Sequence, residues 1–368
     1  MTGPRYSSLV ASLPATVPFV GPETQERARG AAFRARIGAN ENTFGPSPKA
    51  ITAMRAAAAE CWMYCDPENH ALKVALAAHL GVKSENIAVA EGIDSLFGYT
   101  ARMFLEPGDA VVSSLGAYPT FNFHVSGFGA RLGTVPYVAD REDPDSLLAV
   151  ARRENPKLIY FANPDNPMAS WWPAANVQHF IDAIPPASVL CLDEAYHEFS
   201  PSDTAPPLDV SRPNILRFRT FSKAYGMAGA RIAYVIGETS TIKSFDKIRN
   251  HFSVNRIAQA GAIAALADQD YLRETIAKVA RARDRIGVIA RANGLEPLPS
   301  AANFVALDCH RDGVYAKRVL DGLITRGVFV RMPGIAPLNR CIRISAGTDA
   351  DLTIFAETLP EALADAQR

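Results

Sequence analysis

Short apolar runs alternate with longer helical patterns through the middle of the chain, and this alternation constrains the fold more than any other feature. The candidate strands cover residues 87–90, 110–113, 134–138, 158–162, 189–192, 215–220 and 231–236, and several of them are almost wholly apolar and flanked by Gly, Pro or Asp. Helical patterns at residues 94–105, 144–154 and 174–183 lie between some of them. Strands that are apolar on both faces, separated by helices, are typical of a parallel sheet covered by helices. We therefore predict an open α/β sheet, whose ligands bind beyond the carboxyl ends of its strands.

The pattern changes after residue 256. Residues 257 to about 293 predict one long helix, followed by a strand at 303–307, a helix at 313–326 and strands at 328–331 and 341–345. A chain of 368 residues is long enough for about two domains. We predict a large domain over residues 45–256 and a smaller α+β domain over residues 257–368.

Composition excludes several classes of function. The 38 Lys and Arg residues balance the 38 Asp and Glu residues, which argues against a surface that binds nucleic acid or anionic lipid. No apolar run approaches the length of about 18 residues that a membrane span requires. The five cysteines are scattered and form no C-x-x-C motif, so we predict reduced thiols in a cytoplasmic protein and no metal site.

Lys223 is the lysine best placed for chemistry. It follows a predicted buried strand directly, in the segment RFRTFSK at residues 217–223, whereas most of the other lysines lie in helical or polar contexts. A lysine at the ligand-binding edge of an α/β sheet can lose its proton by desolvation and form a Schiff base. The alternative interpretation is a solvated loop or helix-capping lysine.

Polar residues end two neighbouring predicted strands. Asp193 follows the strand predicted at 189–192. A carboxylate that faces a pyridine nitrogen keeps the ring protonated. Tyr196 is three residues further on, so the chain must leave the strand after Asp193 if both side chains are to meet one ligand. The segment NPDNP at residues 163–167 ends the preceding strand in a rigid turn that offers an amide. Taken singly, each of these is equally explained as a loop or a cap.

Several motifs together resemble a known family. They are TFSKAYGMAGAR at residues 220–231, NENTFGPSP at 40–48, DEAY at 193–196, SVNRIAQ at 253–259 and PSAANF at 299–304. Taken in their order along the chain, they resemble the pyridoxal-phosphate-dependent aminotransferases of fold type I, most closely the histidinol-phosphate aminotransferase branch. The resemblance covers the chain from about residue 18 to residue 348. It implies a mostly parallel seven-stranded sheet, a smaller α+β domain, and an N-terminal segment (residues 1–44) that packs with the small domain and the partner subunit.

The resemblance implies a role for each matching residue around the cofactor ring. Lys223 would hold pyridoxal 5′-phosphate as a Schiff base and, once released, would move the proton between the substrate α-carbon and the cofactor. Asp193 would pair with the pyridinium nitrogen. Tyr196 and Asn166 would hydrogen-bond the 3′ oxygen, and Tyr118 would stack on the ring, although a tyrosine beside a proline is also an ordinary core residue.

The resemblance also implies a cradle for the cofactor phosphate at a helix start, where backbone N–H groups suit an anion. Its members would be Gly92, Ile93, Asp94, Thr220, Ser222 and Arg231. The alternatives are that Gly92 only starts a helix and that Arg231 pairs with a surface carboxylate. Tyr64 would reach the phosphate from the other subunit, which implies a homodimer with shared sites.

Two arginines near the C-terminus match substrate-binding positions of the family. Arg343 matches an anion-binding arginine of the whole superfamily, and Arg331 a second one typical of the histidinol-phosphate branch, where the pair holds the substrate phosphate. The planar guanidinium binds phosphate or carboxylate with two hydrogen bonds; the alternative for each is a surface residue at a strand end. The resemblance also places Asn42 and Phe19 at the substrate, and Phe19 replaces an expected tyrosine.

The expected reaction is a ping-pong amino transfer from histidinol phosphate to 2-oxoglutarate. Phe19 makes the predicted pocket more apolar, and Met168 and Ala169 replace the family's usual Thr-Gly. These departures leave open a transaminase for aromatic or other amino acids. A decarboxylase of a phosphorylated amino acid on the same scaffold is a third alternative, and a cofactor-sensing regulator would need a DNA-binding module that the sequence before the aminotransferase region does not contain.

Overall fold

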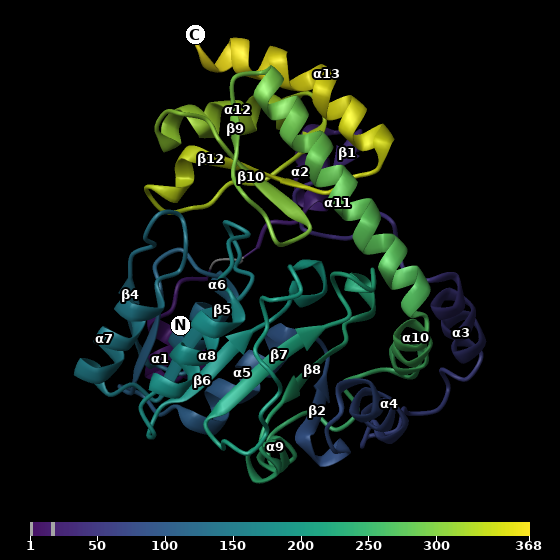
Figure 1. The fold of residues 1–368 in the computed structure, drawn as a ribbon, viewed down its shortest axis with the longest axis vertical. Helices are drawn as coiled ribbons and strands as arrows, with labels where there is room; N and C mark the ends of the chain where they lie inside the picture. The colour runs from purple at the N-terminus through teal and green to yellow at the C-terminus, as the bar shows by residue number, and fades with distance from the viewer. Residues whose placement is uncertain (1–2, 16–18) are drawn as a thin grey trace.

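A seven-stranded sheet forms the centre of the computed structural model, which describes residues 3–15 and 19–368 (Figure 1). Its strand order is β2 (Ile87–Ala90), β8 (Ala233–Ile236), β7 (Ile215–Thr220), β6 (Val189–Asp193), β5 (Leu158–Ala162), β3 (Ala110–Ser114) and β4 (Arg131–Val135). Strand β8 runs antiparallel to both of its neighbours, and the other pairs are parallel. The prediction of a mostly parallel seven-stranded sheet is confirmed.

The inner strands of the sheet are buried on both faces, which explains why most of them are nearly continuous apolar runs. Successive residues point to opposite faces: Tyr160 stacks on Phe121, with ring centroids 4.8 Å apart, whereas Phe161 packs on Phe180 at 4.9 Å. Helices α5 (Ile93–Phe104) and α6 (Pro119–Gly127) contribute to the core on the first face, and α7 (Pro144–Glu154) and α8 (Ala174–Ala183) to the core on the second.

Two predicted strands are misplaced. Strand β4 occupies Arg131–Val135 rather than residues 134–138, because it pairs with β3 in a register that sets Arg131 opposite Ala110. This edge strand is only partly buried, so its sequence lacks the apolar run of the inner strands. Strand β8 begins two residues later than predicted, at Ala233, since Arg231 adopts a left-handed backbone conformation with φ of 54°.

The single helix predicted over residues 257–293 is wrong. The chain forms α10 (Arg256–Ala267) and α11 (Gln269–Ala292), separated at Asp268, whose backbone leaves the helical region. The Asp268 carboxylate accepts a hydrogen bond from Lys49 Nζ at 2.8 Å. Helix α10 packs on α3 (Pro48–Ala58), where Gly261 lets the Met54 side chain approach closely. No Gly or Pro marks the break, so the helical pattern continues through it.

A second layer lies above the sheet in Figure 1. Strands β9 (Glu296–Pro297), β10 (Phe304–Asp308) and β12 (Cys341–Ser345) form an antiparallel sheet, which α11, α12 (Gly313–Thr325) and α13 (Asp349–Ala366) accompany. The N-terminal segment joins this layer because β1 (Ala35–Arg36) pairs in parallel with β11 (Val328–Phe329). The predicted strand at 328–331 is thus shorter than expected, and Arg331 forms only an isolated bridge with Arg343.

The remaining helices are α1 (Ser8–Ser12), α2 (Pro22–Arg29), α4 (His70–Leu80) and α9 (Thr239–Phe245). Helix α1 lies against the larger layer, since Leu9 is next to Gly129. Within residues 3–15 and 19–368, the helices are all too short or too polar to cross a bilayer.

Candidate active site

A cavity of about 670 Å³ lies between the carboxyl edge of the large sheet and the second layer. Its walls combine Asp193, Tyr196 and Lys223 from the sheet with Arg331 and Arg343 from the second layer. Strands β5, β6 and β7 are parallel, so their carboxyl ends meet at one edge. The fold therefore collects residues that are far apart in the sequence around one space.

Lys223 lies at the base of this cavity, three residues after β7 ends. Its Nζ donates a hydrogen bond to the Asn40 carbonyl at 3.2 Å and lies 5.6 Å from the Tyr196 ring centroid. Burial, reinforced by the positive charge of Arg343, lowers the pKa of Lys223 to about 8. A lysine with this pKa is partly neutral near physiological pH, which is the state that a nucleophile or a base requires.

Asp193 is the last residue of β6, and the chain leaves the strand there, as predicted. Its Oδ2 accepts a hydrogen bond from the Tyr160 hydroxyl at 2.8 Å, and its Oδ1 accepts one from the Ala195 N–H at 3.0 Å. Burial raises the pKa of Asp193 to about 6. A cationic ring N–H beside it would favour the carboxylate again, so this buried acid suits a protonated pyridine.

Tyr196 points into the cavity from the segment after β6. Its hydroxyl oxygen accepts a hydrogen bond from Asn40 Nδ2 at 3.0 Å, and Asn40 Oδ1 in turn accepts one from Ser345 Oγ at 3.1 Å. Burial raises the pKa of Tyr196 to about 12, which keeps the hydroxyl protonated. Asn40 therefore connects three chain segments at the site.

The cavity contains a site suited to a phosphate. Gly92, with φ of 110°, precedes α5, and a side chain there would collide with the Arg231 guanidinium. Ile93, Asp94, Thr220, Ser222 and Arg231 all line the cavity. A helix start, a hydroxyl pair and a guanidinium together suit an anion, so the residues present fit the phosphate end of pyridoxal phosphate. Tyr118 lies beside them and donates a hydrogen bond to Asp94 Oδ1 at 2.9 Å.

Arg331 and Arg343 form the wall opposite the large sheet. Arg343 Nη1 donates to Asn166 Oδ1 at 2.5 Å, and Arg331 Nη2 donates to the Val20 carbonyl at 2.8 Å. The Nε atoms of both arginines are buried without a partner among the described residues. Burial lowers the pKa of Arg343 to about 10 and also lowers the pKa of Arg331. A buried cation, Arg343, beside a half-buried one, Arg331, favours an anionic ligand in this cavity.

Three predicted site residues lie outside the cavity lining. Asn42 donates its amide to the carbonyls of Lys223, at 3.1 Å, and of Ala224, at 3.0 Å, so it supports the lysine loop from behind. Gly92 lies behind Arg231. Tyr64 is 79% exposed and packs on Phe252. Their proposed roles toward substrate, cofactor phosphate and the partner subunit stay predictions.

Phe19 does lie in the cavity wall, with its ring centroid 4.9 Å from Arg331 Cζ. Sequence reasoning missed three further residues there or beside it, namely Asn40, Tyr160 and Asn122. Asn40 begins one of the motifs that carried the resemblance, whereas no sequence signal marked Tyr160 or Asn122.

Known proteins share this sequence and architecture. The family model for aminotransferase class I and II matches residues 36–359. A histidinol-phosphate aminotransferase of Moorella thermoacetica is 31% identical over 99% of this chain and 94% of its own length, and histidinol-phosphate aminotransferase 2 of Ralstonia nicotianae is 34% identical over 99% and 98%.

A solved structure agrees. The crystal structure of histidinol-phosphate aminotransferase from Sinorhizobium meliloti in complex with pyridoxal-5′-phosphate is 55% identical, with a TM-score of 0.96 over 99% of this chain and 98% of that chain. The chain therefore belongs to the class I and II aminotransferases, fold type I enzymes that use pyridoxal 5′-phosphate, and it resembles their histidinol-phosphate branch.

Proposed function

We propose that this enzyme transfers the amino group of histidinol phosphate to 2-oxoglutarate by a ping-pong mechanism. The arginine pair is the observation that carries the proposal. Arg331 and Arg343 both line the cavity that also holds Lys223. A phosphate dianion matches two guanidinium groups, and relatives that cover nearly the whole chain are named for a phosphorylated amino donor.

The same arginine pair suits the proposed acceptor. 2-Oxoglutarate carries two carboxylates, and a guanidinium binds a carboxylate with the same planar geometry as it binds phosphate. One site can then serve both half-reactions in turn, which is compatible with a ping-pong mechanism. Asn166 supports this use, because its Oδ1 accepts the hydrogen bond from Arg343 Nη1 and so fixes the orientation of that arginine.

Pyridoxal phosphate, when bound, supplies an electron sink that lets the substrate α-carbon release a proton. In our proposal Lys223 Nζ takes up that proton and returns it, because burial already holds its pKa near 8. Asp193 holds the proton on the cofactor nitrogen, and Tyr160 fixes the position of that carboxylate through its 2.8 Å hydrogen bond. Tyr196 donates a hydrogen bond to the cofactor oxygen, while Asn40 orients it.

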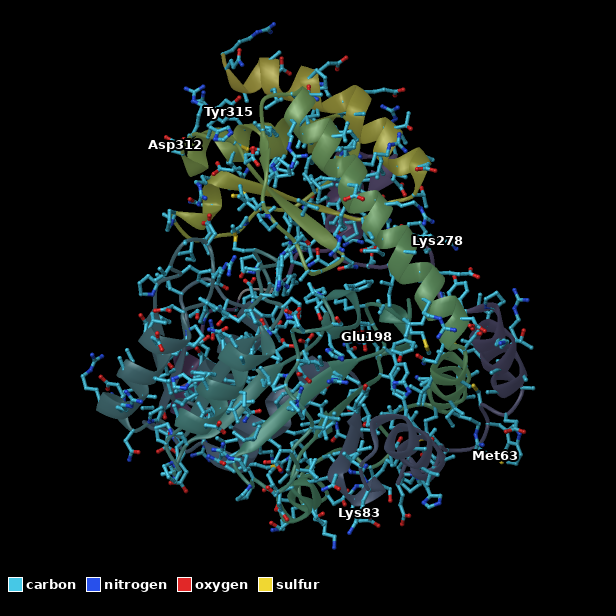
Figure 2. All side chains as sticks on the ribbon, viewed as in Figure 1. Met63, Lys83, Glu198, Lys278, Asp312 and Tyr315 are labelled. Carbon is cyan, nitrogen blue, oxygen red and sulfur yellow. The ribbon has the colours of Figure 1, made fainter. Side chains whose placement is uncertain are left out.

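The proposed assembly is a homodimer. Trp62 and Tyr64 are 82% and 79% exposed, and Phe252 is 49% exposed against the Tyr64 ring. Figure 2 shows Met63, between the first two, at the rim of the molecule. Clustered exposed aromatic side chains are typical of an interface between subunits. In the dimer, Tyr64 would serve the phosphate site of the other subunit.

An aromatic amino acid is the second candidate donor. The Phe19 ring lies in the cavity wall, 6.2 Å from the Tyr118 ring, and provides no hydroxyl to a phosphate. Such a wall favours an apolar ring over a dianion. The Arg331 guanidinium that faces Phe19 at 4.9 Å gives the phosphorylated donor the stronger support.

Steady-state kinetics test the proposal. Initial rates are measured over a grid of histidinol phosphate and 2-oxoglutarate concentrations, with phenylalanine as the competing donor. We expect parallel double-reciprocal lines and a higher kcat/KM for histidinol phosphate. Intersecting lines would exclude the ping-pong scheme, and a higher kcat/KM for phenylalanine would show that an aromatic amino acid is the preferred donor.

Sedimentation of the wild type and of Trp62→Glu at micromolar concentration tests the proposed dimer. We expect a dimer for the wild type and monomers for the variant.

A further inference from the structure

One wall of the cavity has no assigned partner in the proposed reaction. Lys223 and Asp193 account for the reacting end of the donor, and the two arginines account for its phosphate. The remaining wall, called here the β4 wall, lies toward the edge strand and consists of Leu115, Asn122, Leu132, Thr134 and Ile335. Leu115 joins it to β4, because its N–H donates to the Val135 carbonyl at 2.7 Å.

The β4 wall is mostly apolar. Leu115 and Ile335 are 39% and 38% exposed and both line the cavity, and Ile335 lies next to Gly116. Apolar side chains that converge on a cavity suit a flat hydrophobic group of the ligand. In a donor that consists of an amine-bearing carbon, a phosphate arm and a ring, the ring is the part left to occupy this wall.

Asn122 supplies a single side-chain amide to this wall. It lies on α6, four residues after Tyr118, and both residues line the cavity. Its Oδ1 is buried and has no hydrogen-bond partner among the described residues. A buried polar atom without a partner costs free energy. Because Asn122 lines the cavity, a turn of its amide brings Oδ1 to a ligand that can supply the missing bond.

We propose that Asn122 is a specificity-determining residue that selects donors whose ring carries a polar nitrogen. The proposal rests on the proposed function, because it takes histidinol phosphate as the donor. Imidazole offers one N–H donor and one nitrogen acceptor, so either orientation of the Asn122 amide finds a partner on it. A phenyl ring fits the apolar side chains equally well but leaves Oδ1 unpaired, which disfavours it.

The test compares two donors that differ only in the ring: histidinol phosphate and phenylalaninol phosphate. The variant Asn122→Leu keeps the approximate volume and removes the amide. We expect its kcat/KM for the imidazole donor to fall by about two- to twelvefold, the loss of one hydrogen bond, while the value for the phenyl donor stays unchanged or rises. The measured quantity is the ratio of the two values.

Two further variants make the result specific. Asn122→Asp retains an oxygen acceptor and should preserve the preference for imidazole. Asn176→Leu makes the same replacement on the exposed surface of α8 and should leave the ratio unchanged. The cofactor absorbance and the thermal midpoint of each variant verify that it folds and binds pyridoxal phosphate.

The outcomes are distinguishable. If the wild type uses histidinol phosphate but Asn122→Leu keeps the wild-type ratio, the role of Asn122 is refuted and the proposed function stands. If the wild type transaminates other donors but not histidinol phosphate, the proposed function fails, and the inference fails with it. A ratio that falls in Asn122→Leu and is retained in Asn122→Asp supports both.

Discussion

Replacing Arg331 by methionine should weaken the use of phosphorylated donors selectively. Methionine keeps an unbranched stem beside Phe19 and Phe329, whose ring centroids lie 4.9 and 5.6 Å from Arg331 Cζ. The substitution removes the charge and the donor groups. Because the isolated bridge between residues 331 and 343 involves backbone atoms, it should persist in the variant.

The size of the effect follows from the hydrogen-bond donors of Arg331 that are available to a ligand. Nη2 already donates to the Val20 carbonyl at 2.8 Å and Nε is enclosed by protein, so Nη1 is the group left to bind a ligand. A hydrogen bond to a charged group contributes about 1.5–3 kcal/mol. The loss of one such bond lowers kcat/KM by about 10- to 150-fold. Most of the effect should appear in KM, since the phosphate is held equally in ground and transition states.

The assay is a single turnover without acceptor, which isolates the first half-reaction from 2-oxoglutarate binding. Histidinol phosphate and histidinol are compared in wild type and Arg331→Met by the decay of the cofactor absorbance. Histidinol lacks the phosphate, so its kcat/KM should change by less than about threefold, the size of a weak hydrogen bond. Equal losses for both donors, or no loss for either, would refute a phosphate contact at Arg331.

Three further predictions concern the cofactor site. Gly92→Ala should displace Arg231 and weaken the affinity for pyridoxal phosphate, because the new side chain meets the guanidinium. Equilibrium dialysis measures this affinity, and an unchanged value would contradict the proposed phosphate site. Tyr160→Phe should raise the pKa of Asp193 above about 6, because the hydrogen bond that it removes lowers this pKa in the wild type. The variant should also lower the free energy of unfolding in urea by about 1 kcal/mol. An unchanged pH profile of the cofactor spectrum would argue against the effect on Asp193. The rate at which pyridoxal phosphate attaches to the cofactor-free enzyme should rise with pH and reach a plateau just above the Lys223 pKa of about 8, because only the neutral amine reacts. A rate that still rises tenfold per pH unit at pH 10 would refute the lowered pKa.

The pH dependence of stability has a definite sign at Lys223. Its pKa is about 8 in the folded chain and near the ordinary 10.5 in the unfolded chain. Between these values the unfolded chain binds more protons, so Lys223 makes the free energy of unfolding rise with pH in that window. Other groups titrate at the same time, and comparison with Lys223→Met isolates this contribution.

The central strands could be predicted because tertiary burial and local pattern agree there. Strands β2, β5 and β7 have the predicted bounds, since burial on both faces favours apolar residues. The two arginines of β7, Arg217 and Arg219, are buried as ion pairs with Glu194. The edge strand β4 is set by its register with β3, which no local pattern encodes. At the break between α10 and α11, Asp268 likewise contacts a distant residue, Lys49, which is 219 residues away in the chain.

Lys223 and Asp193 could be predicted because each lies at the carboxyl end of a buried strand: Asp193 is the last residue of β6, and Lys223 lies three residues after β7. The role of Tyr160 could not be predicted, because a tyrosine inside a buried strand is ordinarily a core residue. Only the structure shows that its hydroxyl donates to Asp193. Asn122 is ordinary in sequence and becomes notable only as a buried amide without a partner beside the cavity.

The departure at residues 168–170 has a physical basis that the sequence alone does not show. Ala169 adopts a left-handed conformation with φ of 60°, which is costly for a residue with a side chain. The Asp165 carboxylate holds the turn, because it accepts hydrogen bonds from the Met168 N–H at 3.3 Å and from both the Ser170 N–H, at 2.6 Å, and its hydroxyl, at 2.7 Å. The turn that carries Asn166 is thus maintained without the usual glycine.

The most direct measurement of the proposed function mixes the purified, cofactor-loaded enzyme with single donors in the absence of any 2-oxo acid. The absorbance of the lysine-bound cofactor is followed for histidinol phosphate, phenylalanine and a phosphate-free control. We predict rapid, complete bleaching by histidinol phosphate and recovery of the absorbance on addition of 2-oxoglutarate. No bleaching by histidinol phosphate together with fast bleaching by phenylalanine would contradict the assignment of the two arginines to a donor phosphate.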